Sequence, residues 1–214
     1  RGNRLLIIGG GWIGLEIAAT ARWKQVDVMV LEAGPRLCAR SLPPQLSDFL
    51  LDKHRKEGVD VRLSTTVTSI MVGRQRPLVA HLPDEAQEFD AVVVGIGLAL
   101  DTRLAEECGL MVQDGIVVDQ AGRTSDPDVY AVGDVANQHS SWAGCRLRFE
   151  SWANAQNQAI AVGKAIAGMD VLYDELPWFW SDQYDMNLQV LGVPSNDLEG
   201  ILRGSAEEGA FSVF

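Results

Sequence analysis

"RLLIIGGGWIGLEIAATARWKQVDVMVLEAGPR", residues 4–36, combines an apolar run, three consecutive glycines and an Ala-rich segment. The apolar run over 4–8 predicts a buried strand. The spacing of apolar residues over 12–23 predicts a helix with Ile13, Ile17 and Ala18 facing the core. A second strand over 26–31 completes a βαβ unit, which predicts an α/β fold with a parallel sheet.

The break between the first strand and the helix matches the pattern G-x-G-x-x-G through Gly9, Gly11 and Gly14. In such a turn the first glycine permits the tight bend, the second lets a pyrophosphate approach the backbone, and the third lets the helix pack on the strand. The N–H groups at the helix start bind the phosphates. The pattern predicts a dinucleotide site, and the simpler alternative is a tight turn without a ligand. NAD and FAD both fit it.

Glu32 ends the second predicted strand, 18 residues after Gly14. An acidic side chain there binds the adenosine ribose 2′-OH and repels a 2′-phosphate, which favours NADH over NADPH. Arg36 follows closely and is a cation that could attract such a phosphate.

Further elements follow along the chain. The first group begins with a helix from about Pro44 to Gly58 and a strand over 59–63. A β-meander inserted in the α/β domain follows, with strands over 68–72, 77–82 and 89–97. The strand over 89–97 is expected to be fully buried. The second group is three short strands over 115–119, 122–124 and 128–134, and a helix capped by Ser151 that runs to about Ala167. The third group is short strands over 188–193, 199–204 and 210–214 in a small α+β domain.

Charge and composition argue against several classes of partner. The formal net charge of −11 opposes binding to nucleic acid or an anionic membrane, because both would repel the protein. No apolar run approaches the roughly 18–20 residues that span a bilayer. We therefore expect no nucleic-acid partner and no membrane partner.

Cysteine usage indicates a reducing compartment. Cys38, Cys108 and Cys145 are widely spaced and form no Cys-x-x-Cys pair, which predicts a cytoplasmic protein without a dithiol relay. The three histidines match no metal-site spacing and are expected as surface or core residues: His54, His81 and His139. No metal site is predicted.

Five segments in this order resemble a known family: "IIGGGWIGLE", "FDAVVVGIG", "GRTSDPDVYAVGDVA", "FESWANAQNQA" and "PWFWSDQY". They are similar to the flavin-dependent ferredoxin and rubredoxin reductases of the pyridine nucleotide-disulfide oxidoreductase superfamily. The strongest likeness is to the NADH–ferredoxin reductase subunits of bacterial aromatic-ring dioxygenases of the phenylpropionate and biphenyl type. The resemblance covers nearly the whole chain.

The resemblance implies three domains. Residues 1–98 would form a Rossmann-like NAD-binding domain of three-layer β/β/α character, 99–170 the second half of an FAD-binding domain, and 171–214 the beginning of an α+β C-terminal reductase domain. In the family an FAD-binding βαβ unit precedes the NAD domain. The resemblance therefore implies a fragment that lacks this half-domain and the C-terminal end.

The resemblance also implies two cofactor sites. The NAD(H) residues would be Gly9, Gly11, Trp12, Ile13, Gly14, Glu16, Glu32, Gly95, Ile96 and Gly97. Glu16 would lie near the nicotinamide, although a solvent-facing glutamate fits the sequence equally well, and no catalytic residue is assigned with certainty. The FAD residues would be Gly133, Asp134, Val135, Trp152 and Trp180, with Asp134 at a ribityl hydroxyl and the two tryptophans near the isoalloxazine.

The function implied is NADH-dependent reduction of a small [2Fe-2S] ferredoxin through FAD. Hydride transfer needs stacked rings and exclusion of water, so no acid–base dyad is expected. One alternative is an NADH oxidase or peroxidase, and another, for the fragment alone, is an NAD-binding module without activity. A homodimer is compatible with the sequence.

Overall fold

The computed structural model describes residues 2–193 and 199–214, and it divides the chain into two compact units. The first unit contains the residues up to Gly97, the segment Ser181–Leu188, and the described residues from 199 onward. The second unit contains Leu98–Trp180 and Gln189–Val193. Residues 194–198 of the predicted C-terminal domain lie outside the described residues.

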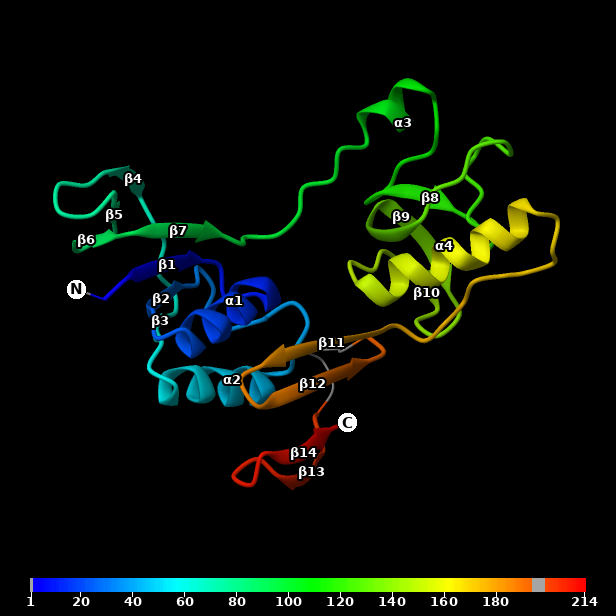
Figure 1. The fold of residues 1–214 in the computed structure, drawn as a ribbon. Coiled ribbons are helices and arrows are strands. Elements are labelled where there is room, and N and C mark those ends of the chain that lie inside the picture. The colour runs from blue at the N-terminus through cyan, green and yellow to red at the C-terminus, as the bar shows by residue number, and fades with distance from the viewer. Residues whose placement is uncertain (1, 194–198) are drawn as a thin grey trace. The chain divides into compact units, whose positions relative to one another are not determined.

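A parallel sheet forms the centre of the first unit, in the strand order β3-β2-β1-β7 (Figure 1). Its strands are β1 (Arg4–Ile8), β2 (Asp27–Leu31), β3 (Asp60–Arg62) and β7 (Ala91–Val94). Helices α1 (Trp12–Trp23) and α2 (Pro44–Lys56) pack on it. Leu6 and Ile7 on neighbouring positions of β1 are both fully buried, because both faces of the sheet are covered.

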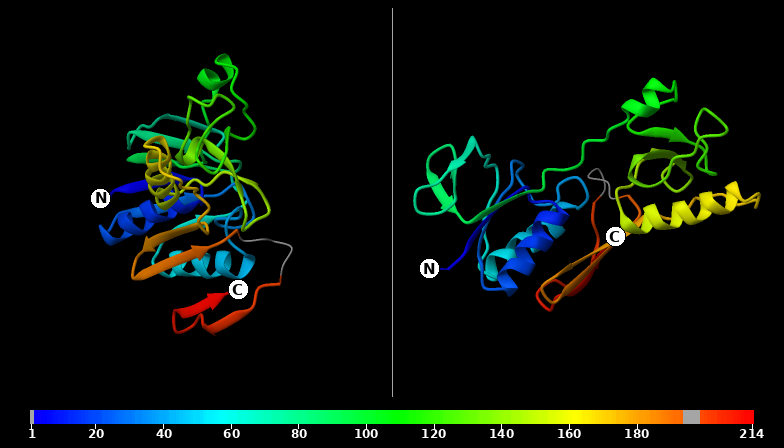
Figure 2. Two further views of the ribbon diagram at one scale, coloured as in Figure 1. Left: turned by 90° about the vertical axis from the view of Figure 1, so that its right-hand side faces the viewer. Right: turned by 45° about the horizontal axis from the view of Figure 1, so that its top comes forward.

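A three-stranded antiparallel meander covers the other face of this sheet. Its strands are β4 (Ser69–Val72), β5 (Leu78–His81) and β6 (Ala86–Phe89). One hydrophobic cluster joins Leu6 and Met29 of the parallel sheet to Ala80 and Phe89 of the meander. The first unit therefore has three layers, meander, sheet and helices, which confirms the predicted β/β/α character (Figure 2).

Three sequence-based expectations for this unit are wrong. The third meander strand is β6, whereas the apolar run from Ala91 forms β7 in the parallel sheet. β7 is not fully buried, since it is the last strand of that sheet and has β1 on one side only. Ile13 is 68% exposed. The buried face of α1 follows Leu15 and Ala18, and a residue two positions from Leu15 points about 200° away around a helix.

The second unit contains a small three-stranded sheet and one long helix. The elements are α3 (Arg103–Glu107), β8 (Ile116–Val118), the 3₁₀ turn η1 (Gly133–Val135), β9 (Ala136–Ser140), β10 (Cys145–Leu147) and α4 (Trp152–Ile166). β9 pairs in parallel with β8 and antiparallel with β10. Ser151 caps α4 as predicted, because its Oγ accepts a hydrogen bond from the Asn154 N–H at 3.2 Å.

The predicted strands over 122–124 and 128–134 are not formed. Within the described chain they contribute a single isolated bridge between Arg123 and Tyr130. Turn hydrogen bonds, such as that from the Val129 N–H to the Asp126 carbonyl at 3.1 Å, use the backbone groups that a strand ladder would need. β9, with the polar sequence "ANQHS", was not predicted.

Two hairpins form the C-terminal stretch. They are β11 (Trp178–Gln183) with β12 (Met186–Leu191), and β13 (Leu202–Ser205) with β14 (Ala210–Val213). The sequence predicted β12, β13 and β14 but missed β11. Among the described residues, no helix is both long and apolar enough to cross a membrane.

Candidate functional site

The glycine turn between β1 and α1 has the backbone geometry that a bound pyrophosphate requires. Gly9 has φ +109°, and a Cβ there would lie 2.2 Å from the Gly95 carbonyl oxygen at the end of β7. A Cβ on Gly14 would lie 2.2 Å from the Gly9 carbonyl oxygen, so α1 packs directly on the turn. A Cβ on Gly11 would meet no described atom within 4 Å beyond its chain neighbours. The second glycine therefore leaves open space at the start of α1.

The start of α1 adjoins the glycine turn. Gly11 is the N-cap residue, and no side chain among the described residues makes a cap hydrogen bond there. Trp12 begins the helix, and its indole N–H donates to the Ser41 Oγ at 2.8 Å. The unpaired N–H groups of a helix start and the positive end of its dipole attract an anion. This end of α1 fits a phosphate group.

Glu32 lies immediately beside the glycine turn. Its Oε2 accepts a hydrogen bond from the Gly10 N–H and its Oε1 from the Gly34 N–H, each at 2.7 Å. These bonds fix the carboxylate at the end of β2. An ionised carboxylate has about four acceptor positions, so ribose hydroxyls can still bind to it.

Arg36 makes contacts other than those considered from the sequence. Its guanidinium donates to the carbonyl oxygens of Leu42 and Ala39 and to the Ser47 Oγ. The side chain thus stabilises the segment that leads into α2. Three of its five N–H donors are therefore already used and are not open to a 2′-phosphate.

Cys38 lies beneath the glycine turn. Its backbone N–H donates to the Gly10 carbonyl at 3.0 Å, and its side chain is buried. Burial, followed by the charges of Glu32 and Glu16, raises the pKa of the Cys38 thiol to about 12. The buried thiol therefore stays protonated at neutral pH.

The end of β7 meets the glycine turn. The Gly95 N–H donates to the Ile8 carbonyl at 2.8 Å, so Gly95 lies next to Gly9. Ile96 is 73% exposed, and Gly97 has φ +109°. The structure thus brings the predicted segment Gly95–Gly97 to the same edge of the sheet as the glycine turn.

Glu16 is held by residues that the sequence did not indicate. Its Oε1 accepts a hydrogen bond of 2.6 Å from the Oγ of Ser181, a buried residue of β11. Both residues belong to the first unit. Glu16 is therefore half-buried and hydrogen-bonded within the first unit. A signal was present, since Ser181 lies in the segment "PWFWSDQY", but the sequence does not show which helix this strand contacts.

The second unit contains the turn η1 with Gly133, Asp134 and Val135. The Gly133 N–H donates to the Oε1 of Gln158 on α4 at 2.7 Å, and Gly133 has φ +73°. Arg148 donates to the Asp134 carbonyl at 3.0 Å. The pKa of the Asp134 carboxyl is raised by burial and then by Glu150, against the opposing charge of Arg148. Gln158 and Arg148 are positioning side chains that sequence analysis missed.

Three tryptophans of the second unit form a cluster in which Trp180 contacts the other two. Trp152 is 69% exposed at the start of α4 and meets Trp180 edge-on, with 5.9 Å between ring centroids. Trp180 stacks on Trp178 at 5.0 Å. Trp178 was not predicted, although alternate residues of a strand lie on one face. These rings provide aromatic surface that suits a flavin ring.

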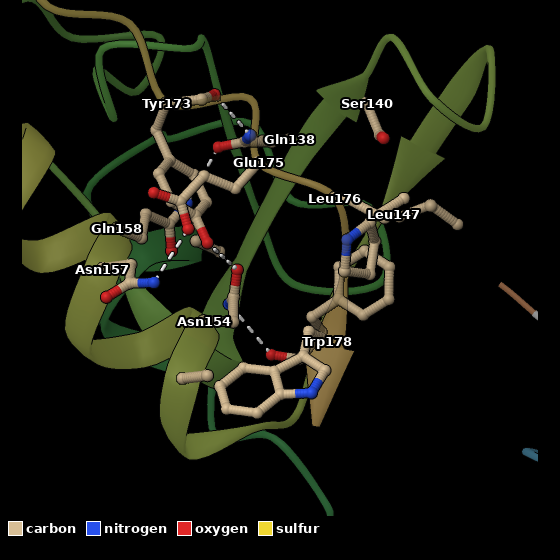
Figure 3. Close-up of a pocket in the computed structure, with 14 residues that line it drawn as sticks. Gln138, Ser140, Leu147, Asn154, Asn157, Gln158, Tyr173, Glu175, Leu176 and Trp178 are labelled. Carbon is tan, nitrogen blue, oxygen red and sulfur yellow. Dashed lines mark hydrogen bonds between the residues drawn. The ribbon is translucent and has the colours of Figure 1, made fainter. Parts of the chain in front are cut away.

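A small cavity of about 40 Å³ with both polar and apolar lining lies between β9, α4 and the segment before β11 (Figure 3). Gln138, Asn154 and Gln158 line it, and the Gln158 amide donates to the Gln138 Oε1 at 2.9 Å (Figure 3). A space of this size holds water molecules and not an isoalloxazine ring. One of its lining residues, Gln158, is also hydrogen-bonded to Gly133 of η1.

Metal binding receives no support from the described part of the chain. No three His, Cys, Asp or Glu residues gather there in a way that could hold a metal ion. His54 is a buried core residue, as one of the two expectations for it proposed.

The comparisons with known proteins decide the family. Residues 1–159 match the family model described as pyridine nucleotide-disulphide oxidoreductase. The chain belongs to this family. Residues 178–214 match a second model, described as reductase C-terminal.

Curated members of the family give the most detailed similarity. The ferredoxin–NAD(+) reductase component of the anthranilate 1,2-dioxygenase system from Burkholderia cepacia is 37% identical over 214 residues, covering 100% of this chain and 53% of the relative. Putidaredoxin reductase from Pseudomonas putida is 40% identical over 215 residues, covering 99% of this chain and 51% of the relative. The chain thus spans about half the length of these relatives.

A solved structure has the same fold. The covalent complex of putidaredoxin reductase with putidaredoxin contains a chain that superposes with a TM-score of 0.92 at 39% identity, covering 99% of this chain and 52% of that chain. The predicted family and the mixed α/β fold with a C-terminal β region are confirmed. Membership of this family supports FAD and NAD(H) as the pair of cofactors.

Proposed function

We propose that this chain is part of an NADH-dependent flavoprotein reductase that passes electrons through FAD to a small [2Fe-2S] ferredoxin of an aromatic-ring dioxygenase system. The observation that carries the proposal is the pairing of an open glycine turn with an acidic residue. Gly11 leaves space at the helix start, and Glu32 is fixed beside it. Relatives named as ferredoxin–NAD(+) reductase components support the reaction.

The NAD(H) residues of this proposal are those at the edge of the sheet. Gly9, Gly11 and Gly14 shape the backbone around the pyrophosphate, Trp12 and Ile13 begin the helix that binds it, and Glu32 accepts from the ribose hydroxyls. The segment Gly95–Gly97 and the Glu16 carboxylate lie toward the nicotinamide end. NADH is preferred because Glu32 repels a 2′-phosphate and Arg36 is occupied by carbonyl groups.

The FAD residues are those of the second unit. The backbone of Gly133–Val135 approaches the FAD pyrophosphate, and the Asp134 carboxylate accepts a hydrogen bond from a ribityl hydroxyl. Trp152 and Trp180 contact the flavin ring. When bound, NADH supplies a hydride, and FAD divides the electron pair into the single electrons that an iron–sulfur acceptor takes. The chain itself contributes binding, orientation and exclusion of water.

The same proposal covers domains, assembly and location. We place the NAD-binding domain at 1–98, the second half of the FAD-binding domain at 99–170 and the C-terminal domain at 171–214. The family models that match 1–159 and 178–214 support a change of domain between them. A homodimer and a cytoplasmic location belong to the proposal too, and the exposed free thiols of Cys108 and Cys145 suit a reducing compartment.

The test uses the whole reductase that contains this chain, purified with FAD. Reduction of cytochrome c is measured with NADH, with and without a [2Fe-2S] ferredoxin, alongside oxygen consumption. We expect cytochrome c reduction that depends on the ferredoxin and exceeds oxygen consumption. NADPH and ferredoxin stripped of its cluster serve as controls. Oxygen consumption at a comparable rate without ferredoxin would instead identify an NADH oxidase and overturn the proposal.

A further inference from the structure

Buried polar side chains form a continuous row of hydrogen bonds in the first unit. The row starts at Tyr184, passes through His54, Gln183 and Ser181, and ends on the Glu16 carboxylate. His54, Gln183 and Ser181 are at most 1% exposed. A buried polar network is stabilising only when its groups are paired, and each of these three has partners on both sides.

The donors and acceptors of this row can be assigned in only one way, with the hydrogen bonds starting from the Glu16 carboxylate as a pure acceptor. The Ser181 hydroxyl donates to the Glu16 carboxylate, which only accepts, so the Ser181 oxygen accepts from the Gln183 amide nitrogen at 3.0 Å. The Gln183 Oε1 then faces the His54 Nε2 at 2.8 Å, and this nitrogen must carry the proton. A neutral His54 ring accepts at Nδ1 from the Tyr184 hydroxyl at 2.9 Å.

The surroundings of His54 favour the neutral ring. Burial is the largest cause that lowers the His54 pKa, and Lys53 lowers it further, while the hydrogen bond with Gln183 and the charge of Glu57 raise it. Burial also raises the pKa of the Tyr184 hydroxyl, so it remains a donor. The histidine therefore has one tautomer, with the proton on Nε2.

An ion pair fixes the far end of the row. Lys53 on α2 contacts the Asp185 carboxylate at 2.7 Å and the Glu57 carboxylate at 2.9 Å, and its ammonium lies 5.5 Å from the centre of the Tyr184 ring. Tyr184 and Asp185 are the two residues between β11 and β12. The turn of this hairpin is thus held on α2, and the row reaches Glu16 from a fixed starting point.

Glu16 lies close enough to the glycine turn for its position to affect a bound dinucleotide. It follows Gly14 by two residues in α1, and Gly14 packs directly against the Gly9 carbonyl of the turn. Ser181 is the only described residue that donates a hydrogen bond to Glu16, and it uses Oε1. The Oε2 atom accepts nothing from the described residues.

We propose that Ser181, Gln183 and His54 are positioning residues for NADH, because their one-directional row of hydrogen bonds holds the Glu16 carboxylate in the orientation that the cofactor meets. The inference rests on the proposed function, since it concerns the same NADH site. It adds that the hairpin β11–β12, outside the βαβ unit, sets the geometry of that site. Without the row, Glu16 would be free to turn toward the phosphates and repel them.

The experiment is a double-mutant cycle on the whole reductase, with the NADH dissociation constant measured by titration calorimetry. Ser181→Ala should raise this constant about tenfold, as expected for a lost hydrogen bond to a charged group. In the Glu16→Gln background the same substitution should change it less than twofold. Ser181→Thr keeps the hydroxyl and should restore binding, and Ser212→Ala, at an exposed position of β14, is the matched control.

A second readout does not depend on NADH. Nitrogen-15 NMR of labelled histidine, assigned with His54→Gln, should show protonated Nε2 and unprotonated Nδ1 for His54 at neutral pH. A protonated Nδ1 would contradict the direction of the hydrogen bonds and so overturn the proposal. An unchanged NADH dissociation constant for Ser181→Ala would also overturn it. An equal effect of Ser181→Ala in both backgrounds would also overturn it. If the wild type fails to bind NADH, the proposed function is overturned as well. If the wild type binds NADH and the variants do not behave as described, only the positioning role is overturned.

Discussion

Two turns of this chain are proposed to bind dinucleotide phosphates, and they are built differently. The turn at Gly9–Gly14 in the first unit takes its shape from backbone contacts, with Gly9 against Gly95 and Gly14 against Gly9. The turn at Gly133–Val135 in the second unit depends on the distant side chains of Gln158 and Arg148. The glycine motif therefore marks a turn that is shaped by backbone contacts, whereas the second turn depends on two particular side chains that no motif shows.

The largest expected effect separates ligand binding from stability at the first turn. Gly11→Val should weaken NADH binding at least about 100-fold, because the side chain enters the space at the helix start. The free energy of unfolding should fall by no more than about 1 kcal/mol, since Gly11 is extended and its Cβ would meet no described atom within 4 Å beyond its neighbours. Titration calorimetry and thermal unfolding measure the two quantities.

Gly9→Ala is the matched comparison at the same turn. Here φ is +109° and the new Cβ would overlap the Gly95 carbonyl, so stability should fall by about 2 kcal/mol or more. If Gly11→Val unfolds the protein as readily as Gly9→Ala, the second glycine is a structural residue and not an opening for a ligand.

The second turn should be sensitive to one buried amide. Gln158→Leu leaves the Gly133 N–H and the Gln138 Oε1 without partners, which should reduce stability by about 2–4 kcal/mol. It should also release FAD from the whole reductase, measured by flavin absorbance after gel filtration. Gln156→Leu, on the exposed side of α4, should change stability by less than about 0.5 kcal/mol. Equal effects of the two substitutions would contradict the role of Gln158.

The third expected effect is a pH dependence of the free energy of unfolding, caused by His54 in the first unit. The buried His54 has a lowered pKa, whereas its ordinary value of 6.5 applies to the unfolded chain. Just below pH 6.5 the unfolded state therefore binds more protons than the folded state, and stability falls as the pH is lowered through this window. Carboxyl groups with lowered pKa titrate at lower pH and do not contribute there: Glu85, Asp101, Asp174 and Asp185.

His54→Gln should reduce this pH dependence, and His139→Gln, at an exposed position of β9, should leave it unchanged. The loss between pH 7 and 5.5 should be about 1 kcal/mol, measured by chemical unfolding at each pH. A wild-type protein with equal stability at both pH values would show that His54 is not held neutral.

The smallest expected effect is a difference in the rate of thiol modification between a cysteine of the first unit and a cysteine of the second. Cys38 beneath the glycine turn is buried with a pKa raised to about 12, whereas Cys145 on β10 is exposed. A thiol reagent at pH 8 should modify Cys145 rapidly and Cys38 only after unfolding. Mass spectrometry of peptides from a time course identifies each site. Rapid modification of Cys38 in the folded protein would show that the first turn is more open than described.

The comparison of the two turns also explains what the sequence could predict. The βαβ unit, the glycine geometry and the place of Glu32 follow from motif spacing over 4–36, because the pairing of β1 with β2 and the hydrogen bond from Gly10 to Glu32 both lie within that segment. The contact between Ser181 and Glu16 joins positions 165 residues apart, so local pattern gives no access to it. Gln158 and Arg148 act on η1 over 25 and 14 residues, and they were missed for the same reason.

The errors in the fold have a related cause. The apolar composition of the run after Phe89 predicts a fully buried strand, but burial depends on which strands flank it. The polar strand β9 carries no alternation of apolar residues, and its buried Asn137 and Gln138 pair with distant groups. Hydrophobic pattern alone identifies neither an edge strand of apolar sequence nor a buried strand of polar sequence.

The most direct test of the central claim is the ratio of NADPH to NADH dissociation constants, measured by titration calorimetry for the wild type and Glu32→Ala. Glu32 fixed beside the glycine turn should make this ratio at least about tenfold in the wild type, a difference of about 1.4 kcal/mol. The ratio should fall toward one in Glu32→Ala, because both the ribose contact and the repulsion of the 2′-phosphate are lost. An unchanged ratio in Glu32→Ala would contradict the assignment of this turn to NADH.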